Sequence, residues 1–167
     1  MNLSTCVDVP AGSGLAIVTL LIEHADDSSF HPAFLDYVES AATLGMSLRR
    51  HAPANWARHV MLSGPGAPRA HTLSRLVQSG WSPCTVPTLL PPLRPRSRRW
   101  FYTFTKLHVF SLVQFRRVLS LDSDVVAVAP LPNALLNALD TSKFEVAAAQ
   151  VRCVWRMTAE VTHLLQP

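Results

Sequence analysis

Apolar residues along the chain form short continuous runs that alternate with runs of helical spacing. The clearest continuous run is LAIVTLLI at 15–22, which is rich in branched side chains. Such a composition is typical of a strand that is covered on both faces, as in a parallel sheet. Apolar residues then recur at helical spacing from Pro32 to Arg50, and these two residues suit the first and last turns of a helix. The pattern predicts a strand followed by a helix.

The same alternation continues through the middle of the chain. Residues 59–62 predict a second strand, which a Ser-Gly-Pro-Gly turn ends. A second helix around Leu73 is capped by Gly80, and residues 81–86 predict a third strand. Strands that alternate with helices predict an α/β fold with a doubly wound, mostly parallel sheet. In such folds ligands bind at the carboxyl ends of the strands.

A third helix is predicted after a loop at 90–100 that is rich in proline and arginine. Thr105 is a suitable cap for this helix, which would cover residues 106–115. An apolar strand at 118–121 follows and delivers Asp122 at its end. The apolar face predicted for the third helix consists of Leu107, Phe110, Leu112 and Val113.

The rest of the chain adds fewer elements. Residues 1–14 are polar and contain glycine and proline, so we expect a loose tail. Residues 133–139 predict a short helix and residues 145–150 a further strand. With 49% hydrophobic and only 16% charged residues, the chain can bury a real core. We therefore expect residues 15–167 to belong to one domain.

Charge and cysteine content narrow the partners and the compartment. The formal net charge of +4 favours anionic partners such as phosphates. The three cysteines, Cys6, Cys84 and Cys153, show no metal-ligand spacing, which predicts reduced thiols and a cytoplasmic protein. No apolar run reaches the 18 residues that a membrane helix needs, so we predict no membrane segment.

The strongest candidate for chemistry is the Asp122-Ser123-Asp124 motif, which follows the apolar strand. Carboxylates two residues apart share one face of an extended chain, so both can face the same cation. Oxygen ligands on a short loop suit Mn²⁺ or Mg²⁺, which proteins hold together with substrate phosphates. Such an ion can stabilise a departing diphosphate. In the plainer alternative, one aspartate caps the turn and the other is solvated.

A second candidate is the basic loop, with four arginines at 94–99. It could contact a nucleotide diphosphate, or it could be a solvated surface. A non-catalytic module that binds single-stranded nucleic acid is a further alternative, because aromatic residues that can stack on bases follow directly. Their helical spacing favours core packing instead, so nucleic acid is the less favoured partner. These aromatic residues are Trp100, Phe101, Tyr102 and Phe104.

Other catalytic motifs find little support. The histidines form no HxxxH or HxH pair, so we interpret them as structural or exposed, and GxGxxG, GxxxxGK[ST] and a nucleophile elbow are missing. An apolar strand followed by DxDxV also describes the nucleophile loop of haloacid-dehalogenase-like phosphatases, with Asp122 as nucleophile and Asp124 as acid and base. Those enzymes carry the motif on their first strand, whereas most of this chain precedes it.

A segment in the second half of the chain resembles the core of the glycogenin-like enzymes, glycosyltransferase family 8. The matching elements are Thr-Lys-Leu-His at 105–108, Gln-Phe at 114–115 and the strand with its Asp-x-Asp at 118–124. Upstream, residues 18–20 are similar to the first strand of that family, and residues 44–49 are similar to the end of its first helix. Several elements agree in order and spacing.

The resemblance implies the GT-A nucleotide-diphospho-sugar transferase fold and retaining transfer of a hexose from a UDP-sugar with Mn²⁺, or with Mg²⁺. Thr19 and Leu20 would lie by the uracil, Lys106 by the phosphates and sugar, and Arg98 near the nucleotide. The resemblance assigns no catalytic nucleophile. The residues that it implies in donor binding are Thr19, Leu20, Arg98, Lys106, Asp122 and Ser123, and the metal ligands are Asp122 and Asp124.

The family continues beyond its Asp-x-Asp with an Asn-Ser-Gly segment, a histidine metal ligand and an acceptor-binding half. None of these has a counterpart before Pro167. We therefore expect the chain to be the donor-binding half of a longer enzyme that acts on a glycan or protein acceptor. We expect little or no sugar transfer by this chain alone.

Overall fold

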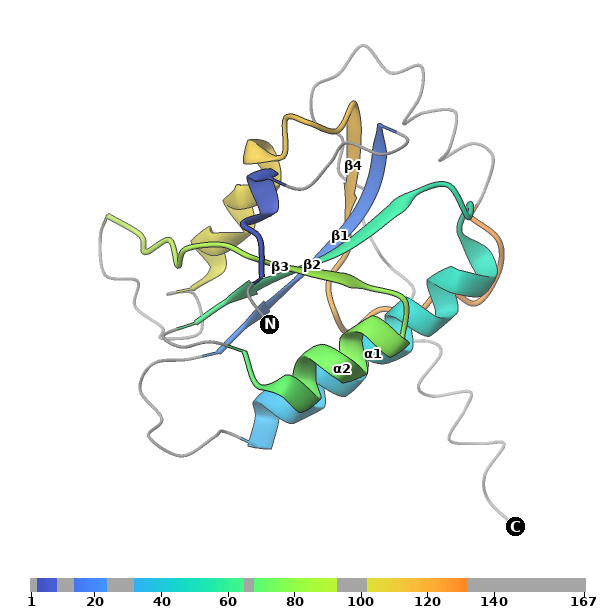
Figure 1. Ribbon diagram of the computed structural model, residues 1–167, viewed down its shortest axis with the longest axis horizontal. Helices are drawn as coiled ribbons and strands as arrows, with labels where there is room; N and C mark the ends of the chain where they lie inside the picture. The colour runs from blue at the N-terminus through green and yellow to red at the C-terminus, as the bar shows by residue number, and fades with distance from the viewer. Residues whose placement is uncertain (1–2, 9–13, 24–31, 65–67, 93–101, 132–167) are drawn as a thin grey trace. The chain divides into compact units, whose positions relative to one another are not determined.

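The computed structural model describes residues 3–8, 14–23, 32–64, 68–92 and 102–131 (Figure 1). The predicted elements at 133–139 and 145–150 lie outside these residues. The strands are β1 Leu15–Ile22, β2 Ala57–Ser63, β3 Ser82–Thr85 and β4 Arg117–Ser120. The α-helices are α1 Pro32–His51 and α2 Ala70–Gln78, and the 3-10 helices are η1 Cys6–Asp8 and η3 Thr103–Ser111.

The four strands form a parallel sheet in the order β3-β2-β1-β4. From β1 to β3, each new strand is added on the same side of the previous one. The chain then crosses back, and β4 pairs with the opposite edge of β1. Such a reversal defines the topological switch point of a doubly wound fold, which here lies between β1 and β4. The α/β class and the parallel sheet are confirmed.

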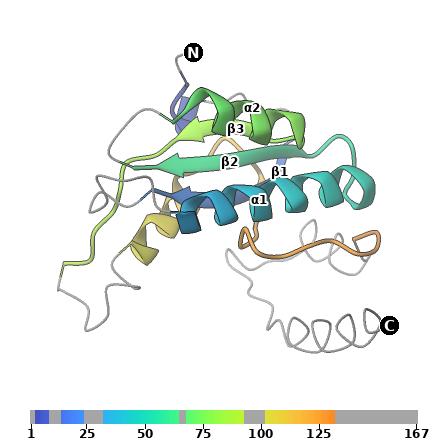
Figure 2. The same cartoon turned by 90° about the horizontal axis from the view of Figure 1, so that it is seen from below.

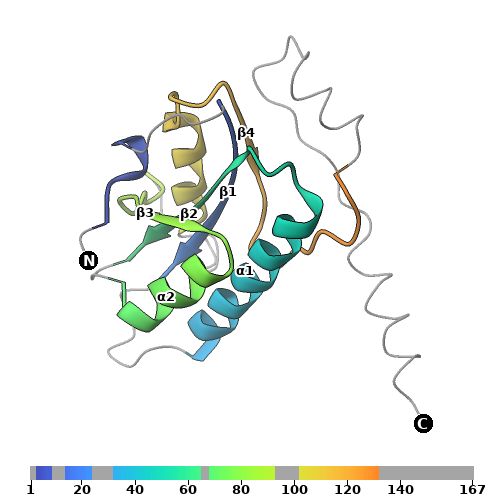
Figure 3. The same cartoon turned by 45° about the vertical axis from the view of Figure 1, so that its right-hand side comes forward.

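The sheet lies between two layers. Figure 3 shows α1 and α2 on one face, and η1 and η3 on the other. Figure 2, from below, shows the two α-helices along the strands. This arrangement follows from right-handed crossovers, because the β3-to-β4 connection runs in the opposite direction to the first two. Alternate residues of β1 fill the two layers, so Ala16 and Val18 pack against Leu112 and Phe115 on the η3 side.

The packing of α1 against α2 depends on a close contact at Gly45. A Cβ atom at this position would lie 2.5 Å from Nε1 of Trp81 and 2.8 Å from the carbonyl oxygen of Ser79. The indole of Trp81 is buried there and donates a hydrogen bond of 2.7 Å to the carbonyl oxygen of Ala41. Gly80, with a φ of +100°, follows the C-cap of α2, which confirms the predicted glycine stop.

Two predictions about the N-terminal segment are wrong for the residues that the structure describes. Thr5 forms a parallel bridge with Thr85, and the Thr85 amide donates to the carbonyl oxygen of Ser4 at 3.1 Å, so residues 3–8 are not a loose tail. Cys6 and Cys84 form a disulfide and are not reduced thiols. Their 78-residue separation hides the pairing from the sequence, and the fold brings them together in the core on the η3 side.

The third predicted helix differs in both type and orientation. It is a 3-10 helix over Thr103–Ser111, and its period of three residues replaces the period of 3.6 that we assumed. Phe104, Leu107 and Phe110 are spaced by three and are 42%, 48% and 60% exposed. The predicted apolar face is therefore wrong for Leu107, Phe110 and Val113, which are exposed, and right for Leu112, which is buried.

The remaining predicted strands agree with the structure within a few residues. β2 and β3 lie where the pattern predicted them, and β4 covers the predicted apolar strand. In the described part of the sheet β4 is an edge strand, and three of its four residues are half-buried. Among the described residues, no helix is long and apolar enough to span a bilayer.

Candidate functional site

The candidate site lies at the carboxyl ends of β1 and β4, where the sheet reverses direction. Ser120, the last residue of β4, pairs with Val18 of β1, so β1 continues past the end of its neighbour. The Leu121 amide then donates to the carbonyl oxygen of Val18 at 2.9 Å. This register places Asp122 beside the projecting end of β1, at the switch point where doubly wound folds bind ligands.

Lys106 and Asp122 form an ion pair at this position. They are 16 residues apart in the sequence and come from two different elements, η3 and the loop after β4. Both side chains are accessible, at 52% and 63% exposure. An exposed pair of this kind contributes about 0 to 1 kcal/mol to stability, so a ligand can replace either partner at little cost.

Thr105 anchors η3 one residue before Lys106. Its fully buried hydroxyl accepts a hydrogen bond of 3.1 Å from the Leu89 amide and lies 3.4 Å from the Leu89 carbonyl oxygen, to which it can donate. His108 adds a contact of 2.8 Å between its Nε2 and the carbonyl oxygen of Pro87. The prediction that Thr105 caps an α-helix is wrong, because the residue lies inside η3 and binds the segment after β3.

The two aspartates of the motif have different surroundings. Residues 123 and 124 lie in a turn, where the Val125 amide is 3.4 Å from the carbonyl oxygen of Asp122. The same-face geometry of an extended chain therefore does not apply here. Asp124 lines a shallow pocket with Glu39 and Thr43 of α1, whereas Asp122 pairs with Lys106 of η3. Ser123 between them is buried.

The donor set suits a hard cation in its chemistry and is incomplete in number. Carboxylates from Asp122 and Asp124 are the oxygen ligands that Mn²⁺ and Mg²⁺ prefer, and phosphates commonly complete the shell. Within the described ranges, no cluster of three or more His, Cys, Asp or Glu side chains could hold a metal ion by itself. The metal site therefore stays a prediction that requires a phosphate ligand.

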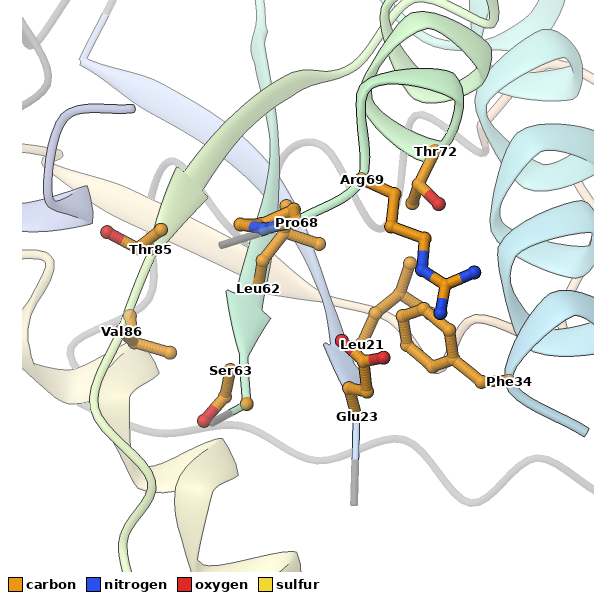
Figure 4. Close-up of a pocket in the computed structure, with 11 residues that line it drawn as sticks. Leu21, Glu23, Phe34, Leu62, Ser63, Pro68, Arg69, Thr72, Thr85 and Val86 are labelled. Atoms are coloured by element: carbon orange, nitrogen blue, oxygen red, sulfur yellow. The ribbon is translucent and has the colours of Figure 1, made fainter. Parts of the chain in front are cut away.

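A cavity of about 190 Å³ opens at the carboxyl ends of β1, β2 and β3 (Figure 4). Figure 4 shows the Arg69 side chain extending toward Phe34 and Glu23. Arg69 occupies the N-cap of α2, so the first turn of this helix begins at the cavity. Ser63 and Thr72 add hydroxyl groups to the lining. The cavity combines an aromatic ring, both signs of charge and hydrogen-bonding groups.

Sequence reasoning assigned no residue of this cavity to a binding site. The available signal was the series of strand ends followed by helix starts, because their common edge is where open α/β sheets bind ligands. The lining comes from three strand ends and the starts of two helices, spread from Leu21 to Val86, so only the fold brings them together. Gly64 also lines the cavity, and a Cβ there would lie 3.0 Å from Cβ of Glu23.

The other donor-binding residues implied by the resemblance are less accessible or lie elsewhere. Thr19 is fully buried, and its hydroxyl has no hydrogen-bond partner among the described residues. Leu20 is half-buried and packs against the core on the η3 side. Arg98 and the rest of the basic loop at 94–99 lie outside the described residues.

His59 is a core residue. Burial lowers the pKa of its imidazole below the usual value of 6.5, while a contact of 3.3 Å between Nδ1 and the Ser82 carbonyl oxygen opposes this shift. Its ring lies 5.5 Å from the Phe115 ring, between centroids. The structural interpretation of the histidines is confirmed for His59.

No protein-family model matches the chain, and no curated protein matches it. The resemblance to glycosyltransferase family 8 therefore rests on the sequence motifs of this chain alone.

Proposed function

We propose that this chain binds the nucleotide-diphosphate part of a UDP-sugar at the carboxyl ends of β1 and β4, as the donor-binding part of a glycosyltransferase. The observation that supports this proposal best is the contact between Lys106 and Asp122. Both residues were assigned to the donor from the sequence, and both lie at the switch point of the sheet.

The proposed role of Lys106 is to contact the diphosphate. Its ammonium group would neutralise part of the charge that grows on the departing UDP. A phosphate oxygen can take the place of the Asp122 carboxylate, because the existing ion pair is exposed and weak. Asp122 is then released toward the ribose or a metal ion.

Asp124 is the proposed metal ligand, together with Asp122 and the phosphates of the donor. When bound, Mn²⁺ or Mg²⁺ would supply Lewis-acid stabilisation of the diphosphate. Asp124 is exposed and lines a pocket with Glu39 and Thr43 of α1, so it and Asp122 can share a cation only if the turn at 123–124 rearranges when the donor binds.

The cavity beside Glu23 and Phe34 is the proposed position of the uracil ring. Leu21 and Glu23 come directly after the residues that the resemblance places near the base, and both line the cavity. An aromatic ring and hydroxyl groups suit a planar, polar base. In this arrangement the nucleotide would lie across the end of β1, from the cavity to Lys106.

A titration of UDP by calorimetry in the presence of Mn²⁺ tests the proposal. We expect Lys106→Ala to weaken UDP binding by about tenfold or more, because a charge-assisted hydrogen bond of about 1.5 to 3 kcal/mol is lost. Arg50→Ala is the matched control. Arg50 is an exposed cation in the last turn of α1, whereas the proposed site lies at the carboxyl ends of the strands. Equal losses of UDP affinity in the two variants would show that UDP binding depends only on the net charge of the protein and not on Lys106. Absence of UDP binding by the unaltered protein would refute the proposal.

A further inference from the structure

η3 is a weak element by itself. A 3-10 helix has poorer hydrogen-bond geometry than an α-helix. Phe104, Leu107 and Phe110 are 42%, 48% and 60% exposed, and the residue of η3 that packs against the core, Val109, lies in its second half. Apolar burial therefore contributes little to holding η3 in place at its N-terminal end.

The contacts that hold this end of η3 are polar and go to the segment after β3. Thr105 is the one fully buried residue of η3, and its hydroxyl contacts both the amide and the carbonyl group of Leu89. Both contacts are part-buried, so loss of the acceptor for the Leu89 amide costs about 1 kcal/mol, at the lower end of the range for buried groups. The contact between His108 and Pro87 lies one turn further on.

We infer that Thr105 is a positioning residue, whose hydroxyl fixes η3 to the Leu89 backbone so that the next residue, Lys106, reaches Asp122. The inference rests on the proposed function for the role of Lys106 in donor binding. It adds a residue that touches neither donor nor metal and acts through Lys106. The side chain of Thr105 points to Leu89, and Lys106 comes from the same helical turn and contacts the loop after β4.

Lysine acetylation provides a test that needs no ligand. Lys106 and Lys143 are the lysines of the chain, so a brief exposure to acetic anhydride followed by peptide mass spectrometry measures Lys106 with Lys143 as internal reference. We expect Asp122→Asn to raise Lys106 acetylation about two- to fivefold, as loss of an exposed ion pair allows. Thr105→Val, which keeps the shape and removes the hydroxyl, should raise it equally, and Thr105→Ser should leave it unchanged.

If folded Thr105→Val acetylates Lys106 at the same rate as the unaltered protein, the inference is overturned. It is also overturned if Thr105→Ser raises Lys106 acetylation as much as Thr105→Val does. If Thr105→Val does not fold, the unaltered protein in graded urea gives the answer. Below global unfolding, Leu89 amide exchange and Lys106 acetylation should then rise at the same urea concentration. Separate rises would overturn the inference.

UDP titration connects the inference to the proposed function. We expect Thr105→Val to weaken UDP binding by about tenfold, as Lys106→Ala does, with no further loss in the double variant. If the unaltered protein does not bind UDP, the proposed function fails, and the acetylation result still decides whether Thr105 positions Lys106. Additive losses in the double variant would contradict action through Lys106.

Discussion

Cys6 is covalently bonded to Cys84, and this bond ties the N-terminal segment to β3 across 78 residues of sequence. The bridge between Thr5 and Thr85 lies directly beside it. Disulfides persist in oxidising compartments and are rare in the reducing cytosol. The cytoplasmic prediction depended on reduced thiols, and Cys6 and Cys84 are not reduced in the structure.

Removing this disulfide should destabilise the fold. Closing a loop of this length lowers the entropy of the unfolded chain, which corresponds to about 4 to 5 kcal/mol. We expect Cys6→Ser to lower the free energy of unfolding in urea by about that amount, and the addition of reductant to do the same to the unaltered protein. Cys153→Ser is the control and should respond to reductant like the unaltered protein. Equal stability of oxidised and reduced protein would contradict the assignment.

Acidification should destabilise the protein through His59. Burial lowers the pKa of His59 in the folded state below 6.5, so near that pH the unfolded chain binds more protons than the folded chain. The free energy of unfolding should therefore fall as the pH decreases from about 6.5 to the folded-state pKa. His59→Gln should remove this dependence, and His51→Gln should keep it. A pH dependence that survives in His59→Gln would identify another group as its source.

Gly45→Ala should destabilise the contact between α1 and α2. Alanine normally stabilises the interior of a helix by about 1 kcal/mol relative to glycine. Here the added Cβ would lie 2.5 Å from the Trp81 indole and 2.8 Å from a backbone oxygen, so the helices must separate. We expect a net loss of about 1 to 3 kcal/mol in urea unfolding. Asp36→Ala, at an exposed position of α1, should cost little, and a gain in stability by Gly45→Ala would disprove the contact.

The sequence predicted those elements whose patterns are strong and regular. The continuous apolar run of β1 and the helical spacing of α1 allowed one interpretation each, and Gly80 marked the end of α2. η3 was missed because residues at a spacing of three fit both helical periods over a short stretch, and only packing shows that Leu107 faces outward. Cys6 and Cys84 were unpaired in the prediction because sequence spacing contains no information on a contact made by tertiary folding.

Only part of the candidate site was predicted, because local sequence patterns contain no information on contacts made by tertiary folding. Asp122 was named because a strand end followed by carboxylates is a local signal, and Lys106 was named only through the resemblance to glycosyltransferase family 8. Their contact depends on the crossover that places η3 on the face opposite α1, which no local pattern contains. The cavity beside Glu23 and Phe34 was missed because separate strand ends and helix starts supply its lining.

The most direct test of the central claim is the dependence of UDP binding on Mn²⁺, measured by calorimetry with the metal ion and with a chelator. If Lys106, Asp122 and Asp124 form a donor site, UDP should bind with Mn²⁺ at least about tenfold more tightly than without it. Asp124→Asn should abolish this difference, and Asp36→Asn should preserve it. Equal UDP affinity with and without Mn²⁺, or no UDP binding in either condition, would contradict the account.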